Sequence, residues 1–258
     1  MDIKINDQLF IVGGATSGFG KAITQALLTE GANVIAVARN VDKLQELKAK
    51  GGANIEILAG DITQLDTIDR LEKVVGIRQL HGLVVNAGGP PAKTFLETSL
   101  EDWDNTYKSL LRWKVAITQT FAPRMAAQHY GRIVYIESSS VKQPLENLVL
   151  SNSLRLAVVG FVKTLSQEIS KSGVTLNILA PGSHDTPAIE RIYKKKAEQT
   201  GAATDIVRQA AIQQIPVGSL GDANNFASLA LWLLSPASKY ITGQTISVDG
   251  GMIKGAFG

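Results

Sequence analysis

Short apolar runs rich in β-branched residues alternate with longer helical patterns along the chain. The runs that predict strands lie at 9–14, 32–38, 54–61, 82–88, 131–138, 174–182 and 245–251. The helical patterns lie at 21–31, 41–50, about 64–75, 100–128 and 151–172, and the region 187–234 is mostly helical. This alternation indicates a parallel sheet covered by helices on both faces. We expect an α/β protein with a three-layer, doubly wound fold, a seven-stranded parallel sheet and one domain over 1–258.

Composition narrows the classes of function. The chain has 258 residues, 45% of them hydrophobic, with a net charge of +3 and no cysteine. The weak charge argues against nucleic acid, and the absence of cysteine excludes disulfides and thiolate metal sites. His81, His129 and His184 lack metal-ligand spacing. The N-terminus does not resemble a signal peptide, and no apolar run is long enough for a membrane helix. We expect a soluble cytoplasmic protein with no membrane partner and no metal.

A glycine-rich loop, GGATSGFG at 13–20, joins the first strand to the first helix. Gly14, Gly18 and Gly20 allow a tight turn, close approach to a pyrophosphate, and packing of the helix on the sheet. The unpaired N–H groups at the start of the helix favour an anion. A purely structural turn is the alternative, but a strand before the loop and a helix after it favour a dinucleotide-binding Rossmann fold.

The spacing of these glycines resembles the TGxxxGxG motif of the short-chain dehydrogenase/reductase family, with Gly13 in place of the threonine. Other landmarks follow in the family's order: Asp61 after the third strand, NAG at 86–88, PGxxxT at 181–186, and a closing strand within 240–251. The likeness covers residues 8 to 251. It implies a nicotinamide cofactor held by Gly14, Thr16, Ser17, Gly18, Phe19, Gly20, Arg39, Asp61, Ile62, Asn86, Ala87, Gly88, Arg155, Pro181, Gly182 and Thr186.

The end of the second strand favours NADP(H) over NAD(H). NAD-binding Rossmann proteins place an acidic residue there for the ribose 2′-hydroxyl, whereas this chain has Ala38 followed by Arg39. A guanidinium can hold a 2′-phosphate with paired, charge-assisted hydrogen bonds. The hydroxyls of Thr16 and Ser17 can add to this. The alternative is that Arg39 only stacks on adenine or faces water.

The family's catalytic residues are largely replaced. Its serine aligns with Ser138, but the positions of its tyrosine, lysine and asparagine hold Ser151, Arg155 and Leu110. The spacing of four keeps Ser151 and Arg155 on one helix face. An aliphatic hydroxyl cannot replace a phenol as an acid, and an arginine does not readily give up its proton. The usual proton relay is therefore unsupported.

Lys142 is the candidate substitute, as a donor or as a positive charge beside an enolate or alkoxide. A solvated loop lysine is the alternative. Glu137, next to Ser138, is expected to point to the other face of the sheet. Asn152 and Ser153 are candidates to bind substrate or to cap the helix.

The segments NAGGPP (86–91) and SNSLR (151–155) resemble a β-ketoacyl-carrier-protein-reductase-like group of the family that lacks the YxxxK motif. One member type with a similarly altered site reduces a conjugated alkene, which needs no strong built-in acid. We expect an NADP(H)-dependent reductase of a carbonyl or activated alkene in a small-molecule substrate. The alternative is an inactive nucleotide-binding regulatory or scaffold protein.

Residues 187–216 are expected to form a helical lid over the substrate, by resemblance to the family. Lys194, Lys195 and Lys196 can attract an anionic substrate, although a charge run is more often a solvated face. The resemblance also implies a homotetramer assembled through the helices near 100–128 and 151–172.

Overall fold

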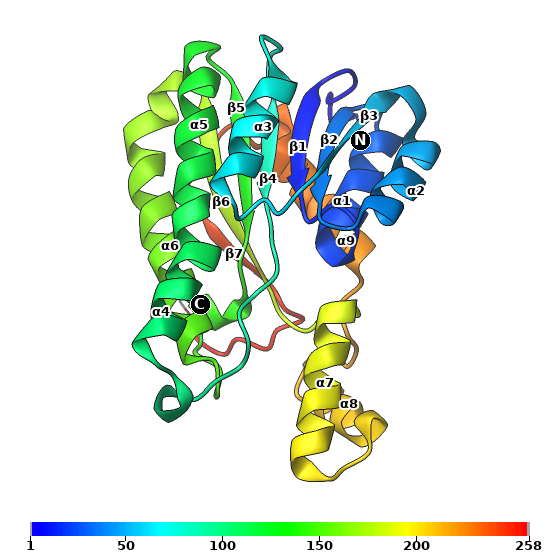
Figure 1. Cartoon of the computed structure of the whole chain (residues 1–258), viewed down its shortest axis with the longest axis vertical. Helices are drawn as coiled ribbons and strands as arrows, with labels where there is room; N and C mark the ends of the chain where they lie inside the picture. Colours follow the sequence, from blue (N-terminus) through cyan, green and yellow to red (C-terminus); the bar gives the residue numbers. More distant parts are fainter. Residues whose placement is uncertain (1, 257–258) are drawn as a thin grey trace.

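The computed structural model describes residues 2–256 and places seven strands in one parallel sheet of order β3-β2-β1-β4-β5-β6-β7 (Figure 1). The predicted fold class is confirmed. The strands are β1 (Leu9–Gly13), β2 (Asn33–Ala38), β3 (Ile55–Ala59), β4 (Gly82–Val85), β5 (Gly131–Ile136), β6 (Val174–Pro181) and β7 (Thr245–Val248). Chain order reverses between β1 and β4, and ligands of doubly wound sheets bind at the carboxyl ends of the strands beside this switch point.

Two apolar cores lie on opposite faces of the sheet. One packs α1 (Gly18–Thr29), α2 (Val41–Gly51) and α9 (Ala223–Leu234) against it. The other packs α3 (Leu65–Val75), α5 (Trp113–Ala127) and α6 (Val149–Ile169). Every residue of β1, β4, β5 and β6 is buried. This explains why these strands are nearly continuous apolar runs rather than alternating ones.

The long helix predicted over 100–128 is interrupted. It consists of α4 (Leu100–Thr106), a π-helical segment η3 (Tyr107–Arg112) and α5. π-Helical turns are rare and occur often at functional sites. This one contains Leu110, which is buried, and it immediately precedes the turn of α5 that carries Lys114. Periodicity alone could not show the insertion because buried positions continue at helical spacing across it.

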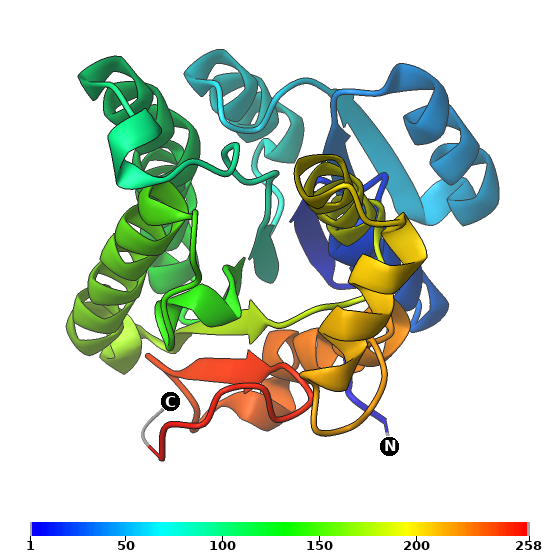
Figure 2. The same cartoon turned by 90° about the horizontal axis from the view of Figure 1, so that it is seen from below.

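The region predicted as a lid forms two helices, α7 (Pro187–Thr200) and α8 (Thr204–Gln213), which project from the carboxyl edge of the sheet (Figure 1). From below they lie on the side of β1 and α1, across from α5 and α6 (Figure 2). Their small core contains Tyr193, Ala197 and Val207. Lys194, Lys195 and Lys196 are exposed, and the Lys195 amine donates to the Ala92 carbonyl at 3.4 Å.

Two findings hold for the described part of the chain. None of its helices has the length and apolar character needed to cross a bilayer. Within residues 2–256, no three His, Asp or Glu side chains gather in a group that could hold a metal ion.

Candidate active site

The glycine loop has the geometry that a pyrophosphate cradle needs. Gly14 and Gly18 have φ angles of +62° and +50°, a region that residues with side chains rarely adopt. A Cβ atom on Gly20 would lie 2.3 Å from the Gly14 carbonyl oxygen. Ser17 precedes α1 without capping it through its side chain, so the first N–H groups of the helix remain for an anion.

Loops from distant parts of the chain surround this cradle. The Asn86 amide donates to the Gly13 carbonyl at 3.0 Å, which fixes the turn after β4 against the turn after β1. A Cβ atom built on Gly13 would lie 2.8 Å from the Ile62 side chain, and one on Gly18 would lie 3.7 Å from Thr186. The structure thus brings together residues that the sequence predicts for cofactor binding.

The turns after β4 and β6 complete the rim. Gly88 is exposed, and a Cβ atom there would meet nothing within 4 Å, which leaves the space beside it open. Ala87 packs on the core. Pro181 ends β6, and Gly182 allows Asp249 to approach within 2.7 Å of the position of a Cβ atom. A dinucleotide fits this arrangement because the glycines keep side chains out of the space beside the turns.

The far end of the cradle carries the features expected for NADP(H). Ala38 is buried, whereas Arg39 is exposed and has no ion pair among the described residues. Asp61 does not point freely into solvent, because its Oδ1 accepts from the backbone N–H and the hydroxyl of Thr63, at 3.0 and 2.8 Å. Thr16 is half-buried beside the loop.

The ring of Phe19 serves the fold. It packs at 4.1 Å from the Phe226 ring and at 5.0 Å from the His184 ring, between α1 and α9. Its backbone N–H remains in the first turn of α1 and is the group left for a cofactor. Nδ1 of His184 lies 3.1 Å from the Gly182 carbonyl, and burial lowers the pKa of this histidine.

A buried carboxylate connects the two helices beside β5. Glu137 accepts hydrogen bonds from the Lys114 amine on α5 and from Nη1 of Arg155 on α6, the latter at 2.8 Å. Strand alternation predicts that Glu137 points to the opposite face from Ser138, and the face that it points to is the one that carries Arg155. Ile133 and Tyr135 face the core beneath α5 and α6, and Glu137 continues that alternation. Its side chain is 0% exposed.

Arg155 is held at two of its nitrogens. Nη1 donates to Glu137, and Nε donates to the Ser151 hydroxyl at 3.0 Å. The predicted pairing of Ser151 and Arg155 on one helix face is thus present. No described residue accepts a hydrogen bond from Nη2. Nη2 lies 3.0 Å from the position of a Cβ atom on Gly89, directly after the Asn86 turn.

Lys114 is an unusual member of this group because its side chain is only 4% exposed. Burial lowers the pKa of Lys114 to about 8, with a smaller lowering from Arg155, whereas the charge of Glu137 acts in the opposite direction. Lysines are rarely buried unless they are paired. The cluster therefore contains two cations and one carboxylate, with water largely excluded.

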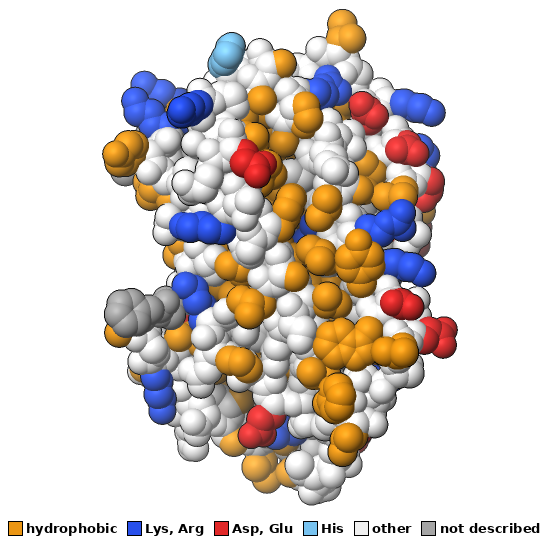
Figure 3. All heavy atoms as spheres, turned by 90° about the vertical axis from the view of Figure 1, so that its left-hand side faces the viewer, with side chains coloured by type: hydrophobic (Ala, Val, Ile, Leu, Met, Phe, Trp, Pro, Cys, Tyr) orange, Lys and Arg blue, Asp and Glu red, His pale blue; other side chains and the backbone are white. Residues whose placement is uncertain are grey.

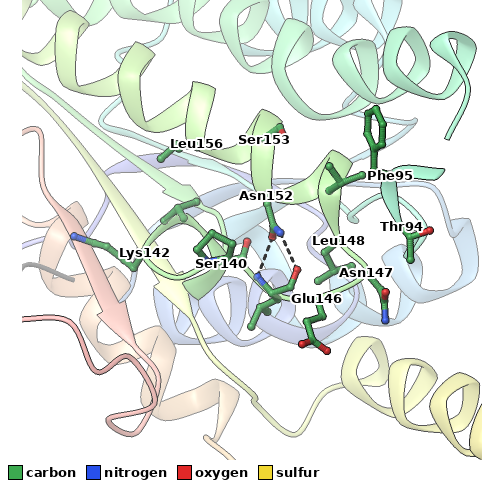
Figure 4. A pocket seen from close by; sticks show the side chains of 14 residues that line it. Thr94, Phe95, Ser140, Lys142, Glu146, Asn147, Leu148, Asn152, Ser153 and Leu156 are labelled. Carbon is green, nitrogen blue, oxygen red and sulfur yellow. Dashed lines mark hydrogen bonds between the residues drawn. The ribbon is translucent and has the colours of Figure 1, made fainter. Parts of the chain in front are cut away.

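A cavity of about 670 Å³ lies beside the start of α6 (Figure 4). The Asn152 amide donates to the Leu145 carbonyl at 2.8 Å, so it holds the loop rather than capping the helix. Ser138 accepts from the Ser140 N–H at 3.1 Å. The amine of Lys142 points away from Asn152 in Figure 4. The apolar lining consists of Phe95, Val141, Pro144, Leu145, Leu148, Val149 and Leu156.

Three polar side chains in this region were not predicted as site residues from the sequence. Ser140 lines the cavity with a buried hydroxyl that has no hydrogen-bond partner in the described structure. Lys114 gave no clear local signal, because Arg112 lies only two residues before it, whereas Glu137 ends an apolar strand. Opposite charges on neighbouring buried elements are expected to pair, but tertiary packing decides which elements are neighbours.

Comparisons with known proteins agree with this arrangement. A family model described as Enoyl-(Acyl carrier protein) reductase matches residues 14–253. Dehydrogenase/reductase SDR family member 6 of Xenopus laevis is 32% identical over 251 residues, covering 96% of this chain and 98% of that protein.

Two solved structures superpose over almost their whole length. YwfH, described as an NADPH dependent reductase involved in bacilysin biosynthesis, matches with a TM-score of 0.92 and 25% identity, covering 97% of this chain and 100% of the other. L-Sorbose reductase from Gluconobacter frateurii, solved with NADPH and L-sorbose, matches with a TM-score of 0.92 and 29% identity, covering 99% and 100%.

Proposed function

Because the chain belongs to the short-chain dehydrogenase/reductase family, we propose that it is an NADP(H)-dependent reductase that acts on an activated alkene next to a carbonyl. NADP(H) is the cofactor that the relatives and the exposed Arg39 support. Bound in the cradle, it supplies the hydride. The observation that carries the proposal is the Arg155 guanidinium, held at the edge of the cradle with Nη2 free of described protein acceptors.

The chemistry of the site favours an alkene over an isolated carbonyl. Hydride addition to the β-carbon of an enone or enoyl group moves an electron pair onto the carbonyl oxygen and makes an enolate. A fixed cation stabilises that oxygen, and water then protonates the α-carbon, so no built-in phenol is needed. Ser151 and Arg155 would replace the family's tyrosine and lysine in this way. The description of the matching family model, which names an enoyl reductase, supports the same substrate class.

Other side chains would orient the substrate. Ser140 offers a buried hydroxyl in the cavity, Ser138 would add one from the adjacent turn, and the apolar wall around Leu148 would take a hydrocarbon part. Cavities of this size are typical of small-molecule sites. Lys142 lines the same cavity and would add positive charge at its rim. The lid helices α7 and α8 would close over the opposite side of the substrate.

The test is a screen of NADPH oxidation, followed at 340 nm, over matched pairs of enones, enoyl thioesters and the corresponding saturated ketones. We expect turnover of the unsaturated members and little or none of the saturated ones. Arg155→Met should lower kcat/KM by about 100-fold, the usual cost of losing an oxyanion donor. Turnover of the ketones alone would contradict the choice of alkene. NADPH binding without turnover of any substrate would favour the regulatory alternative.

We also propose that the chain is a homo-oligomer, as expected from the family. Hydrophobic side chains gather in a band over the face formed by α4, α5 and α6 (Figure 3). Leu156 on α6 and Tyr107 at the α4–α5 junction are 54% and 45% exposed. Large exposed apolar patches usually mark association surfaces. Light scattering should give the mass of a tetramer; a monomer at micromolar concentration would contradict this.

A further inference from the structure

Glu137 holds Arg155, and Lys114 holds Glu137 in turn. Lys114 lies in the first turn of α5, Glu137 follows the end of β5, and Arg155 lies within the first two turns of α6. Three elements therefore meet at one carboxylate. The exposed fractions of the three side chains are 4%, 0% and 11% in that order, so Arg155 is the most exposed member of the cluster.

We propose that Lys114 and Glu137 are positioning residues for Arg155, and that the proton on the Lys114 amine sets the net charge that this cluster presents to the cleft. The inference rests on the proposed function, because it concerns the group that would stabilise the enolate.

The contacts define how Glu137 would act. Arginine has many rotamers, and an exposed guanidinium samples them at little cost. Here Glu137 and Ser151 fix two edges of the guanidinium, and the third edge, Nη2, is turned toward the Gly89 turn. A donor fixed before the reaction stabilises developing charge better than one that must reorganise. Glu137 itself cannot move freely, because it is fully buried and Lys114 holds its other oxygen.

The charge balance defines how Lys114 would act. With Lys114 protonated, two cations and one carboxylate leave one positive charge, and with Lys114 neutral the cluster has none. The charged groups that act on Lys114 are Glu137 after β5 and Arg155 on α6. The phenol of Tyr135, whose hydroxyl pairs with Thr118 on α5, lies near Glu137. Burial raises the pKa of Tyr135, so this phenol stays neutral. With the pKa of Lys114 near 8, the charge would be lost as pH rises through that value.

The activity test compares pH profiles of kcat/KM for wild type, Lys114→Met and Lys114→Arg, using the substrate from the screen. In wild type we expect a fall of at least about fivefold between about pH 7 and 9.5. Lys114→Arg should retain activity without that fall, since arginine stays protonated. Lys114→Met should show at every pH the low rate of wild type at high pH. Lys50→Met, an exposed lysine on α2, is the matched control and should behave as wild type. The same fall in all four proteins would overturn the proposal.

A second readout needs neither cofactor nor turnover. A lysine whose folded pKa lies below its unfolded value binds fewer protons in the folded state between the two pKa values. The unfolding free energy of the wild-type apo protein should therefore rise from about pH 8 toward about pH 10. Lys114→Met should lack this increase, and Lys50→Met should keep it. An increase that persists in Lys114→Met would overturn the charge assignment. Because this test uses no substrate, it separates failure of the inference from failure of the proposed function.

Discussion

Strand β5 has a buried charge near each end, and the two charges are satisfied in different ways. At its start, Arg132 donates to the backbone carbonyls of Ser235, Gly131 and Gly173 at 2.8–3.1 Å and lies 4.3 Å from the Tyr130 ring. Beyond its end, Glu137 binds two charged side chains. The first arrangement joins backbone segments at the edge away from the cradle. The second leaves a donor of Arg155 directed to the edge where the ligand is expected.

The hydrogen-bond partners of a buried charge indicate whether it is available for function. A buried cation that donates only to backbone carbonyls has a structural role, because the fold itself uses its hydrogen-bond donors. A buried cluster with a donor left over at the carboxyl edge of a parallel sheet has a group available for a ligand. Substitutions at the two ends of β5 should therefore have different effects on stability and activity.

The largest effect is expected at Glu137. Glu137→Leu leaves Lys114 and Arg155 buried without their carboxylate, which should destabilise the protein by about 3–5 kcal/mol and abolish turnover. Chemical denaturation measures the first and NADPH oxidation the second.

A matched triple variant keeps this prediction informative. Lys114→Met, Glu137→Leu and Arg155→Met together replace the cluster by apolar groups, and this should restore most of the stability. Activity should not return. Recovery of activity in the triple variant would show that the cluster has only a structural role.

A smaller effect, confined to stability, is expected at the other end of β5. Arg132→Met deprives three carbonyls of their donor and should lower the unfolding free energy by about 2 kcal/mol. At 25 °C kcat/KM should stay within about twofold of wild type, since typical stability exceeds this loss. If Arg132→Met folds but its kcat/KM falls strongly, the charges at the two ends of β5 do not differ in role as proposed.

The sequence predicted the fold and the cradle because both depend on local patterns. Buried parallel strands are apolar runs, and a pyrophosphate turn needs glycines at set spacings, as Gly14, Gly18 and Gly20 show. The partner of Arg155 could not be found this way. Ser151 and Arg155 are four residues apart on one helix, whereas Glu137 and Lys114 meet them only through packing of β5, α5 and α6. The π-helical segment before Lys114 was likewise invisible to periodicity.

The role of Arg155 is best tested by a crystal structure of the wild-type chain with NADPH. We expect Nε and Nη1 of Arg155 still to donate to Ser151 and Glu137, and Nη2 to lie about 3 Å from an oxygen of the cofactor or of a bound substrate analogue. An Arg155 side chain that has left Glu137, or that points away from a cofactor bound in the cradle, would contradict it.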